Sequence, residues 1–171
     1  MDKGLKNLQT AEKNIYEELR ERDNRKKNIV IHQAPEPDRN QPAETKKEKD
    51  KEAITRIFEF IEAGVNTEED PKFMYRAGEP SKTGNSDNPR PVIVGFHSKE
   101  KPETILRNSR KLREDRNKDF KDVTIIPDLT TRQRKEEAEM REEADKRNAE
   151  LSEEEAGNYE WKVMGQQERE D

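Results

Sequence analysis

Between residues 28 and 127 the apolar positions switch between the spacing of strands and the spacing of helices. A β-branched run over 28–33, closed by prolines, predicts a first strand. Residues 34–49, with three prolines and a run of Lys and Glu, predict a loop or linker. From residue 50 a helix is expected to about residue 63, ended by Gly64, because the apolar side chains fall on one stripe: Ile54, Ile57, Phe58, Ile61 and Val65.

The second half of this region repeats the alternation. A strand is predicted over 73–77, a long loop over 78–91 and a third strand over 92–97. A second amphipathic helix follows around Ile105, with Pro102 in its first turn, and a last strand over 123–126 stops at Pro127. The order β-α-β-β-α-β predicts an α+β fold, a ferredoxin-like (RNA-recognition-like) sandwich with one open sheet face. Its expected core is Ile29, Ile31, Ile54, Ile57, Phe58, Ile61, Val65, Phe73, Tyr75, Val92, Val94, Phe96, Ile105, Leu106, Leu112, Phe120, Val123 and Ile125.

Two charged segments flank this region and give three expected domains: 1–27, 28–127 and 128–171. Residues 3–26 predict a helix whose apolar side chains fall on heptad positions, which favours the end of a coiled coil over a solitary or frayed helix. The side chains expected to drive oligomerisation are Leu5, Leu8, Ile15 and Leu19.

The C-terminal segment is expected to be a charged helix followed by part of a further domain. A helix start is predicted at residues 128–131, and the helix runs to about Leu151 with acid–base pairs four residues apart, such as Glu137 with Arg141. Residues 159–164 alternate like a strand that lacks a partner.

Charge is unevenly distributed along the chain. The 171 residues are 44% charged and only 27% hydrophobic, with a net charge of −5. Residues 1–27 carry +2, residues 28–127 are neutral, and residues 128–171, with 8 basic and 15 acidic side chains, carry −7. The acidity is therefore confined to the tail, and nearly all large apolar residues lie in the middle domain.

Several classes of chemistry are disfavoured. The chain has no cysteine, and its two histidines, His32 and His97, are too few for a typical zinc site even if neighbouring strands bring them together. Residues 78–84 lack the Lys-Ser/Thr of a phosphate-binding loop, and Ser81-Lys-Thr-Gly84 lacks the partner motifs of a lactamase. No apolar run is long enough to span a membrane. We expect no enzyme activity, no cofactor and no metal.

Nucleic-acid binding is favoured through arginines rather than through stacked bases. On the open face the usual stacking positions hold Val30, Pro91 and Ile93, none of them aromatic. Guanidinium groups at strand and helix ends suit phosphate contacts, although a merely solvated charged face is the alternative. The candidate nucleic-acid-binding residues are Arg76, Arg90, Arg107, Arg110, Lys111, Arg113, Arg132 and Arg134.

Five blocks in order resemble a known family. They are Arg25-Lys-Lys-Asn-Ile-Val-Ile-His-Gln-Ala-Pro-Glu36, Phe73-Met-Tyr-Arg-Ala-Gly78, Pro89-Arg-Pro-Val-Ile-Val-Gly-Phe96, Ile105-Leu-Arg-Asn-Ser-Arg-Lys-Leu-Arg113 and Ile126-Pro-Asp-Leu-Thr-Thr-Arg-Gln-Arg134. Together they are similar to the RNA-recognition-like domain in the first open reading frame protein of LINE-type (non-LTR) retrotransposons. The resemblance covers residues 25–134 well and 135–164 loosely.

The resemblance implies a coiled-coil trimer that coats single-stranded RNA or DNA as a nucleic-acid chaperone in a ribonucleoprotein. It implies phosphate contacts by Arg76, Arg90, Arg107, Arg110, Arg132 and Arg134, which match the family's motifs. The expected location is the cytoplasm, with ribonucleoprotein granules or the nucleus as alternatives. The alternative function is a self-associating charged helical scaffold, a degenerate copy that does not bind nucleic acid.

Overall fold

The chain divides into two compact units, Met1–Asp128 and Leu129–Asp171. They are seen in a computed structural model that describes residues 2–80, 88–114 and 116–163. Residues 81–87 of the predicted loop over 78–91 therefore lie outside the described residues, and so does Met164 of the predicted last strand. None of the described helices is both long and apolar enough to cross a membrane.

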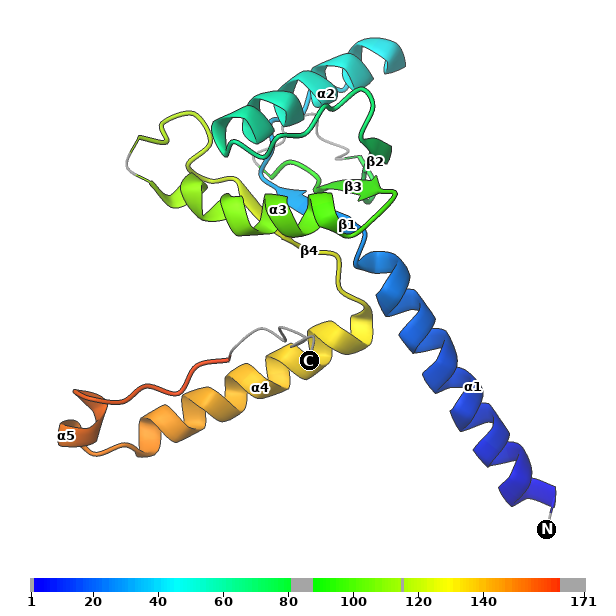
Figure 1. Ribbon diagram of the computed structural model, residues 1–171, viewed down its shortest axis with the longest axis vertical. Coiled ribbons are helices and arrows are strands. Elements are labelled where there is room, and N and C mark those ends of the chain that lie inside the picture. Colours follow the sequence, from blue (N-terminus) through cyan, green and yellow to red (C-terminus); the bar gives the residue numbers. More distant parts are fainter. Residues whose placement is uncertain (1, 81–87, 115, 164–171) are drawn as a thin grey trace. The chain divides into compact units, whose positions relative to one another are not determined.

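The first unit is built on one four-stranded antiparallel sheet (Figure 1). Its strands are β1 (Asn28–His32), β2 (Pro71–Arg76), β3 (Val92–Phe96) and β4 (Thr124–Pro127), in the spatial order β2-β3-β1-β4. β2 and β4 are the edge strands, and β3 and β1 lie between them. The predicted α+β class and all four strands are confirmed, with ends shifted by one or two residues.

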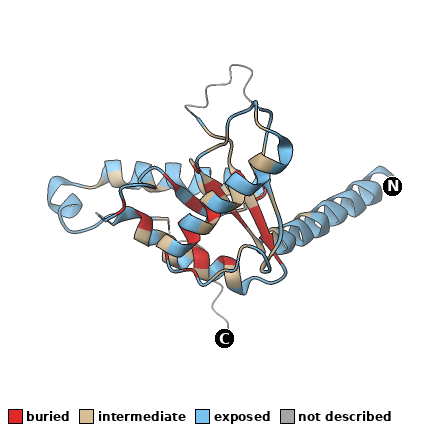
Figure 2. Cartoon of the chain, turned by 90° about the horizontal axis from the view of Figure 1, so that it is seen from above, coloured by how far each residue is buried: buried red, intermediate tan, exposed pale blue. Residues whose placement is uncertain are grey.

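Helices cover one face of this sheet and leave the other open (Figure 1). They are α2 (Ala43–Phe60), α3 (Glu100–Asn108) and the 3-10 helix η1 (Ser109–Arg113). The buried side chains gather between the helices and the sheet (Figure 2), where Ile29, Ile31, Val92 and Val94 meet the helical residues. The open face matters for function, because no helix of this unit covers the side chains on that side of the sheet.

α2 begins seven residues before the expected start, so the prediction of a loop over 34–49 is wrong from Ala43 onward. Pro42 occupies the N-cap position, where its missing N–H costs nothing, and the following Lys and Glu residues are good helix formers. The helix ends at Phe60 because Glu62 takes a left-handed conformation, with φ of 54°, and the Ala63 N–H donates to the Phe58 carbonyl.

Two of the eighteen expected core residues are not in the core. Phe73 is 39% exposed and Tyr75 is 52% exposed, so their assignment to the core is wrong. They share a strand with Met74 and Arg76, and in β2 it is Met74 and Arg76 that point toward the helices. The other sixteen are buried or pack against the buried cluster.

The N-terminal segment forms α1 (Asp2–Arg25), the helix expected there. In the second unit α4 (Thr131–Glu150) begins at Thr130, whose hydroxyl accepts from the Gln133 N–H while the Gln133 side chain accepts from the Thr130 N–H. A short α5 (Glu153–Ala156) follows that the apolar pattern did not reveal.

The strand expected over 159–164 is absent from its described part, residues 159–163. Trp161 instead lies against α4 of the same unit. The backbone N–H of Trp161 donates to the side-chain oxygen of Asn148 at 2.7 Å, and the backbone carbonyl of Trp161 accepts from the side-chain nitrogen of Asn148 at 2.9 Å. The Arg147 guanidinium sits 4.8 Å from the centre of the indole ring. Helix contacts therefore replace the strand partner that this segment lacks.

Candidate nucleic-acid interface

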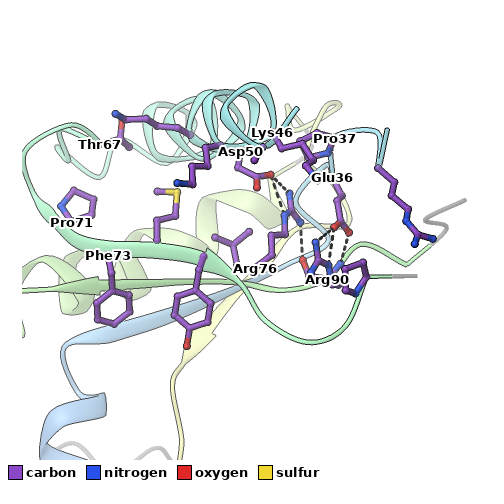
Figure 3. Close-up of a pocket in the computed structure, with 17 residues that line it drawn as sticks. Glu36, Pro37, Lys46, Asp50, Thr67, Pro71, Phe73, Arg76 and Arg90 are labelled. Atoms are coloured by element: carbon purple, nitrogen blue, oxygen red, sulfur yellow. Dashed lines mark hydrogen bonds and ion pairs between the residues drawn. The ribbon is translucent and has the colours of Figure 1, made fainter. Parts of the chain in front are cut away.

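The open face of the sheet carries an exposed aromatic pair. Phe73 and Tyr75 are two residues apart on β2 and therefore point to the same side of the sheet. Their ring centres are 5.9 Å apart with a tilt of 39°. Phe73 points away from α2, on the side opposite to the helices (Figure 3). Two adjacent aromatic rings at the surface are thus available to a ligand.

Gly95 makes room for the Phe73 ring. The two residues are paired across β2 and β3, and an ideal Cβ on Gly95 would lie only 2.2 Å from the Cζ of Phe73. Such a distance is impossible, so the ring can lie this close to β3 only because position 95 has no side chain. The glycine and the aromatic ring act together as one feature of the open face.

The middle of the open face is apolar. A row of side chains crosses the sheet from Tyr75 through Ile93 and Val30 to Ile126, since these residues are paired in the strand register. Ile93 and Val30 are partly exposed, and Ile126 is 43% exposed. The outward positions of the central strands lack aromatic residues, as expected, and the exposed aromatic rings come from the edge strand β2 instead.

Arg76 and Arg90, two of the predicted phosphate contacts, hold the protein together. Arg76 is 5% exposed and reaches Asp50 on α2 at 2.7 Å, and it also donates to the carbonyls of Ala34, Pro35 and Arg90. Its guanidinium therefore fastens the end of β2 to α2 and to the segment after β1. These donors are occupied within the protein. A phosphate would have to displace the carboxylate and carbonyl oxygens that accept from them.

Arg90 is held in the same way by Glu36. The Glu36 carboxylate accepts from the Arg90 backbone N–H at 3.0 Å and from two nitrogens of its guanidinium at 2.7 and 2.8 Å. Burial by itself raises the pKa of Glu36, but the hydrogen bonds and charge of Arg90 outweigh it and lower the pKa below 4.5. Glu36 is therefore charged at neutral pH and fixes the start of β3.

The arginines of the second helical segment lie on the side of the unit away from the aromatic pair. Arg107 belongs to α3, and Arg110 and Arg113 belong to η1; all three are exposed, and none is ion-paired with a residue that the structure describes. Lys111 contacts Glu62 at 2.5 Å. The structure thus keeps Arg107, Arg110 and Arg113 at the surface, but it does not bring them to the open sheet face.

The remaining predicted residues lie elsewhere in the chain. Arg132 and Arg134 are in the first turns of α4 in the second unit, where Arg132 contacts Glu136 and Arg134 contacts Thr131. The four residues predicted for oligomerisation lie on α1 and are 52–64% exposed: Leu5, Leu8, Ile15 and Leu19.

No metal or catalytic cluster emerges among the described residues. No group of three or more His, Asp or Glu side chains there is arranged to hold a metal ion. The strand register places His32 opposite position 91 and His97 opposite position 26, so the two histidines lie at opposite ends of the central strands, about 20 Å apart. They are not neighbours.

The aromatic pair was missed in the sequence because of its register. The segment Phe73-Met-Tyr-Arg76 alternates two kinds of side chain, and hydrophobicity assigns Phe and Tyr to the core. The usable signal is Gly95, which a strand tolerates poorly unless another group lies against it. Comparison with known proteins adds no family assignment: no protein-family model and no curated protein matches this sequence.

Proposed function

We propose that the first unit binds single-stranded RNA or DNA without reading its sequence. We also propose that its fold is of the ferredoxin-like, RNA-recognition-like type. The β-α-β-β-α-β order along the chain, the strand order β2-β3-β1-β4 and the two helices on one face support this fold. In such modules the open sheet face is the surface that meets nucleic acid.

The observation that carries the proposal is the exposed pair Phe73 and Tyr75. Stacking of a base on an aromatic side chain contributes about 1–3 kcal/mol, and it tolerates any sequence because every base has a π-face. Exposed aromatic rings are otherwise unfavourable on a surface, and these are neighbours on the same face with Gly95 clearing the space for one of them. A stacking surface explains why they are not in the core.

Exposed cations on another face of the unit also support the proposal. Arg107, Arg110 and Arg113 are exposed and available to attract a polyanion, whereas Arg76 and Arg90 are occupied in internal contacts. Attraction of this kind acts over about a Debye length, so it assists association even from a different face of a small unit. The resemblance to LINE-type proteins supports the ribonucleoprotein, chaperone-type role as the biological setting.

The test is a filter-binding titration of the full chain with single-stranded RNA of two unrelated sequences. Phe73→Leu/Tyr75→Leu keeps an apolar surface but removes both rings. We expect affinity for both RNAs to fall together by at least about 5-fold, which corresponds to the lower limit for one lost stacking contact. Val30→Ala on the same face is the control and should change little. Unchanged affinity in the double variant, or strong preference for one sequence, would contradict the proposal.

Self-association through α1 is a second proposed property. The observation that favours it is that Leu5, Leu8, Ile15 and Leu19 are all more than half exposed and fall on heptad positions of one helix. A coiled coil would bury these side chains. The alternative function, a charged helical scaffold that does not bind nucleic acid, requires only this self-association. Retained self-association combined with absence of RNA binding at low salt would favour the scaffold.

A further inference from the structure

A groove of about 690 Å³ runs beside the edge strand β2, on the side of the sheet that faces the helices. Its walls are the N-terminal half of α2 and strand β2, and its ends are formed by the segments around Pro37 and Thr67 (Figure 3). Phe73, Met74 and Tyr75 of β2 all line this groove, although the Phe73 ring points away from α2 (Figure 3). The two surfaces are thus continuous around one strand.

Three lysines in the N-terminal half of α2 line this groove, and the glutamates of the same half do not. The helical residues that line it follow the spacing of one helix face and are Ala43, Lys46, Lys47, Asp50 and Lys51. The glutamates of the same stretch, Glu44, Glu48 and Glu52, are not among them. Lys51 pairs with Glu68, whereas neither Lys46 nor Lys47 has an ion-pair partner among the described residues.

The acidic groups in the groove are neutralised. Of the residues that line it, six are basic and two are acidic, a net charge of +4 in a chain whose total is −5. The two acids are Asp50, held by Arg76 at 2.7 Å, and Glu36, held by Arg90 at 2.7 Å. Among the residues that line the groove, no unpaired carboxylate therefore competes with an anion for Lys46 and Lys47.

The other edge of the sheet has the opposite character. Strand β4 is preceded by Asp122 and followed by Asp128, and no lysine or arginine lies within the strand. Asp128 is engaged by Arg25 at 3.1 Å and by the Asn28 amide at 2.9 Å. A polyanion that leaves the open face over β2 meets the cations of the groove, whereas β4 itself supplies none.

We infer that a nucleic-acid strand stacked on Phe73 and Tyr75 leaves the sheet over β2, and that its phosphates contact Lys46 and Lys47 in the groove. The inference rests on the proposed function and adds the path of the backbone. The lysines supply flexible point charges that accept any phosphate geometry, so the contact fixes the direction of the strand without reading its sequence. It assigns phosphate contacts to the N-terminal part of α2, which the sequence pattern predicts as a loop or linker and which is not among the predicted binding residues.

The test is a pair of charge-matched variants titrated with single-stranded oligouridylate at 50 and 200 mM salt. Lys46→Gln/Lys47→Gln removes the two groove lysines that are proposed to contact phosphates and keeps good helix formers in α2. Lys118→Gln/Lys121→Gln removes two exposed lysines outside the groove and is the control. Loss of two phosphate contacts should make the negative slope of log K against log salt shallower by about 1.4. The loss of affinity is then about 7-fold greater at 50 mM than at 200 mM salt. The control should keep the wild-type slope.

A second readout locates the contact directly. Acetylation of lysines, followed by mass spectrometry, should show Lys46 and Lys47 protected by bound oligouridylate, with Lys118 and Lys121 unchanged. Equal slopes for both variants, or equal labelling of Lys46 and Lys47 with and without RNA, would overturn the inference. If the wild type binds and depends on Phe73 and Tyr75 while the groove variant is unaffected, only the path is wrong. If the wild type does not bind at all, the proposed function fails with it.

Discussion

Replacing Gly95 with alanine would disturb the aromatic pair without touching either ring. The new Cβ would lie 2.2 Å from the Cζ of Phe73 and within 2.7 Å of two further ring atoms, so the ring must move. It is free to do so because Phe73 is 39% exposed and its outer atoms are the ones in conflict. The backbone at position 95 is in an ordinary strand conformation and accepts alanine.

The effect on stability should be small. Displacing the ring loses its contact with Tyr75, which contributes about 0.5–1.5 kcal/mol. Replacing a strand glycine with alanine regains about 0.5–1 kcal/mol of backbone entropy. The two terms nearly cancel, and we expect the free energy of unfolding to change by no more than about 1 kcal/mol.

The effect on RNA affinity should be larger. Loss of one stacking position weakens binding by about 1–3 kcal/mol, or about 5- to 140-fold. Chemical denaturation measures the first quantity, and a titration with single-stranded RNA measures the second. Gly95→Ala should lose affinity while it keeps its fold.

A double-mutant cycle with Phe73→Ala identifies the route of the effect. If Gly95→Ala acts by moving the ring, it should weaken RNA binding in the wild type and have no further effect once Phe73 is alanine. Wild-type affinity in Gly95→Ala, or the same loss in both backgrounds, would refute the reasoning.

Three further predictions concern the internal contacts and α1. Arg76→Leu should lower the free energy of unfolding by about 3–5 kcal/mol, because it leaves Asp50 without a counterion; a loss below about 1 kcal/mol in denaturant unfolding would show that this network is dispensable. Because the pKa of Glu36 is lowered in the folded state, its contribution to stability is present above its ordinary value of 4.5 and is lost as pH falls through the folded-state pKa. Glu36→Gln should therefore flatten the acid side of the stability profile, and an unchanged profile would refute the role of Arg90. Leu8→Asp should reduce self-association in sedimentation equilibrium at hundreds of micromolar, a prediction that fails if the wild type is already a pure monomer.

Periodicity predicted the elements of the first unit because each buried face is continuous along its strand or helix. It placed the core correctly in β1, β3 and β4, where the side chains predicted to point inward are the buried ones. It failed at β2. There the ion pair between Arg76 and Asp50 of α2 requires the Arg76 side chain to face the helices, and this turns Phe73 and Tyr75 to the open face. That pairing joins residues 26 positions apart and has no local signature.

The candidate site depended on the same register. Alternation alone cannot tell which of two mixed faces turns inward, so Phe73 and Tyr75 were assigned to the core. The groove was hidden for a different reason. Residues 43–49 resemble a charged linker, and only after they are wound into α2 do Lys46 and Lys47 separate from the neighbouring glutamates.

The most direct test of the central claim is photo-crosslinking of the full chain to a single-stranded oligonucleotide that carries 4-thiouridine. Trypsin cleaves after Lys72 and after Arg76, so the aromatic pair is released as one short peptide, residues 73–76. We predict that this peptide carries the main cross-link and that Phe73→Leu/Tyr75→Leu removes it. Cross-links confined to residues 107–113 of α3 and η1, with none on residues 73–76, would contradict binding on the open sheet face.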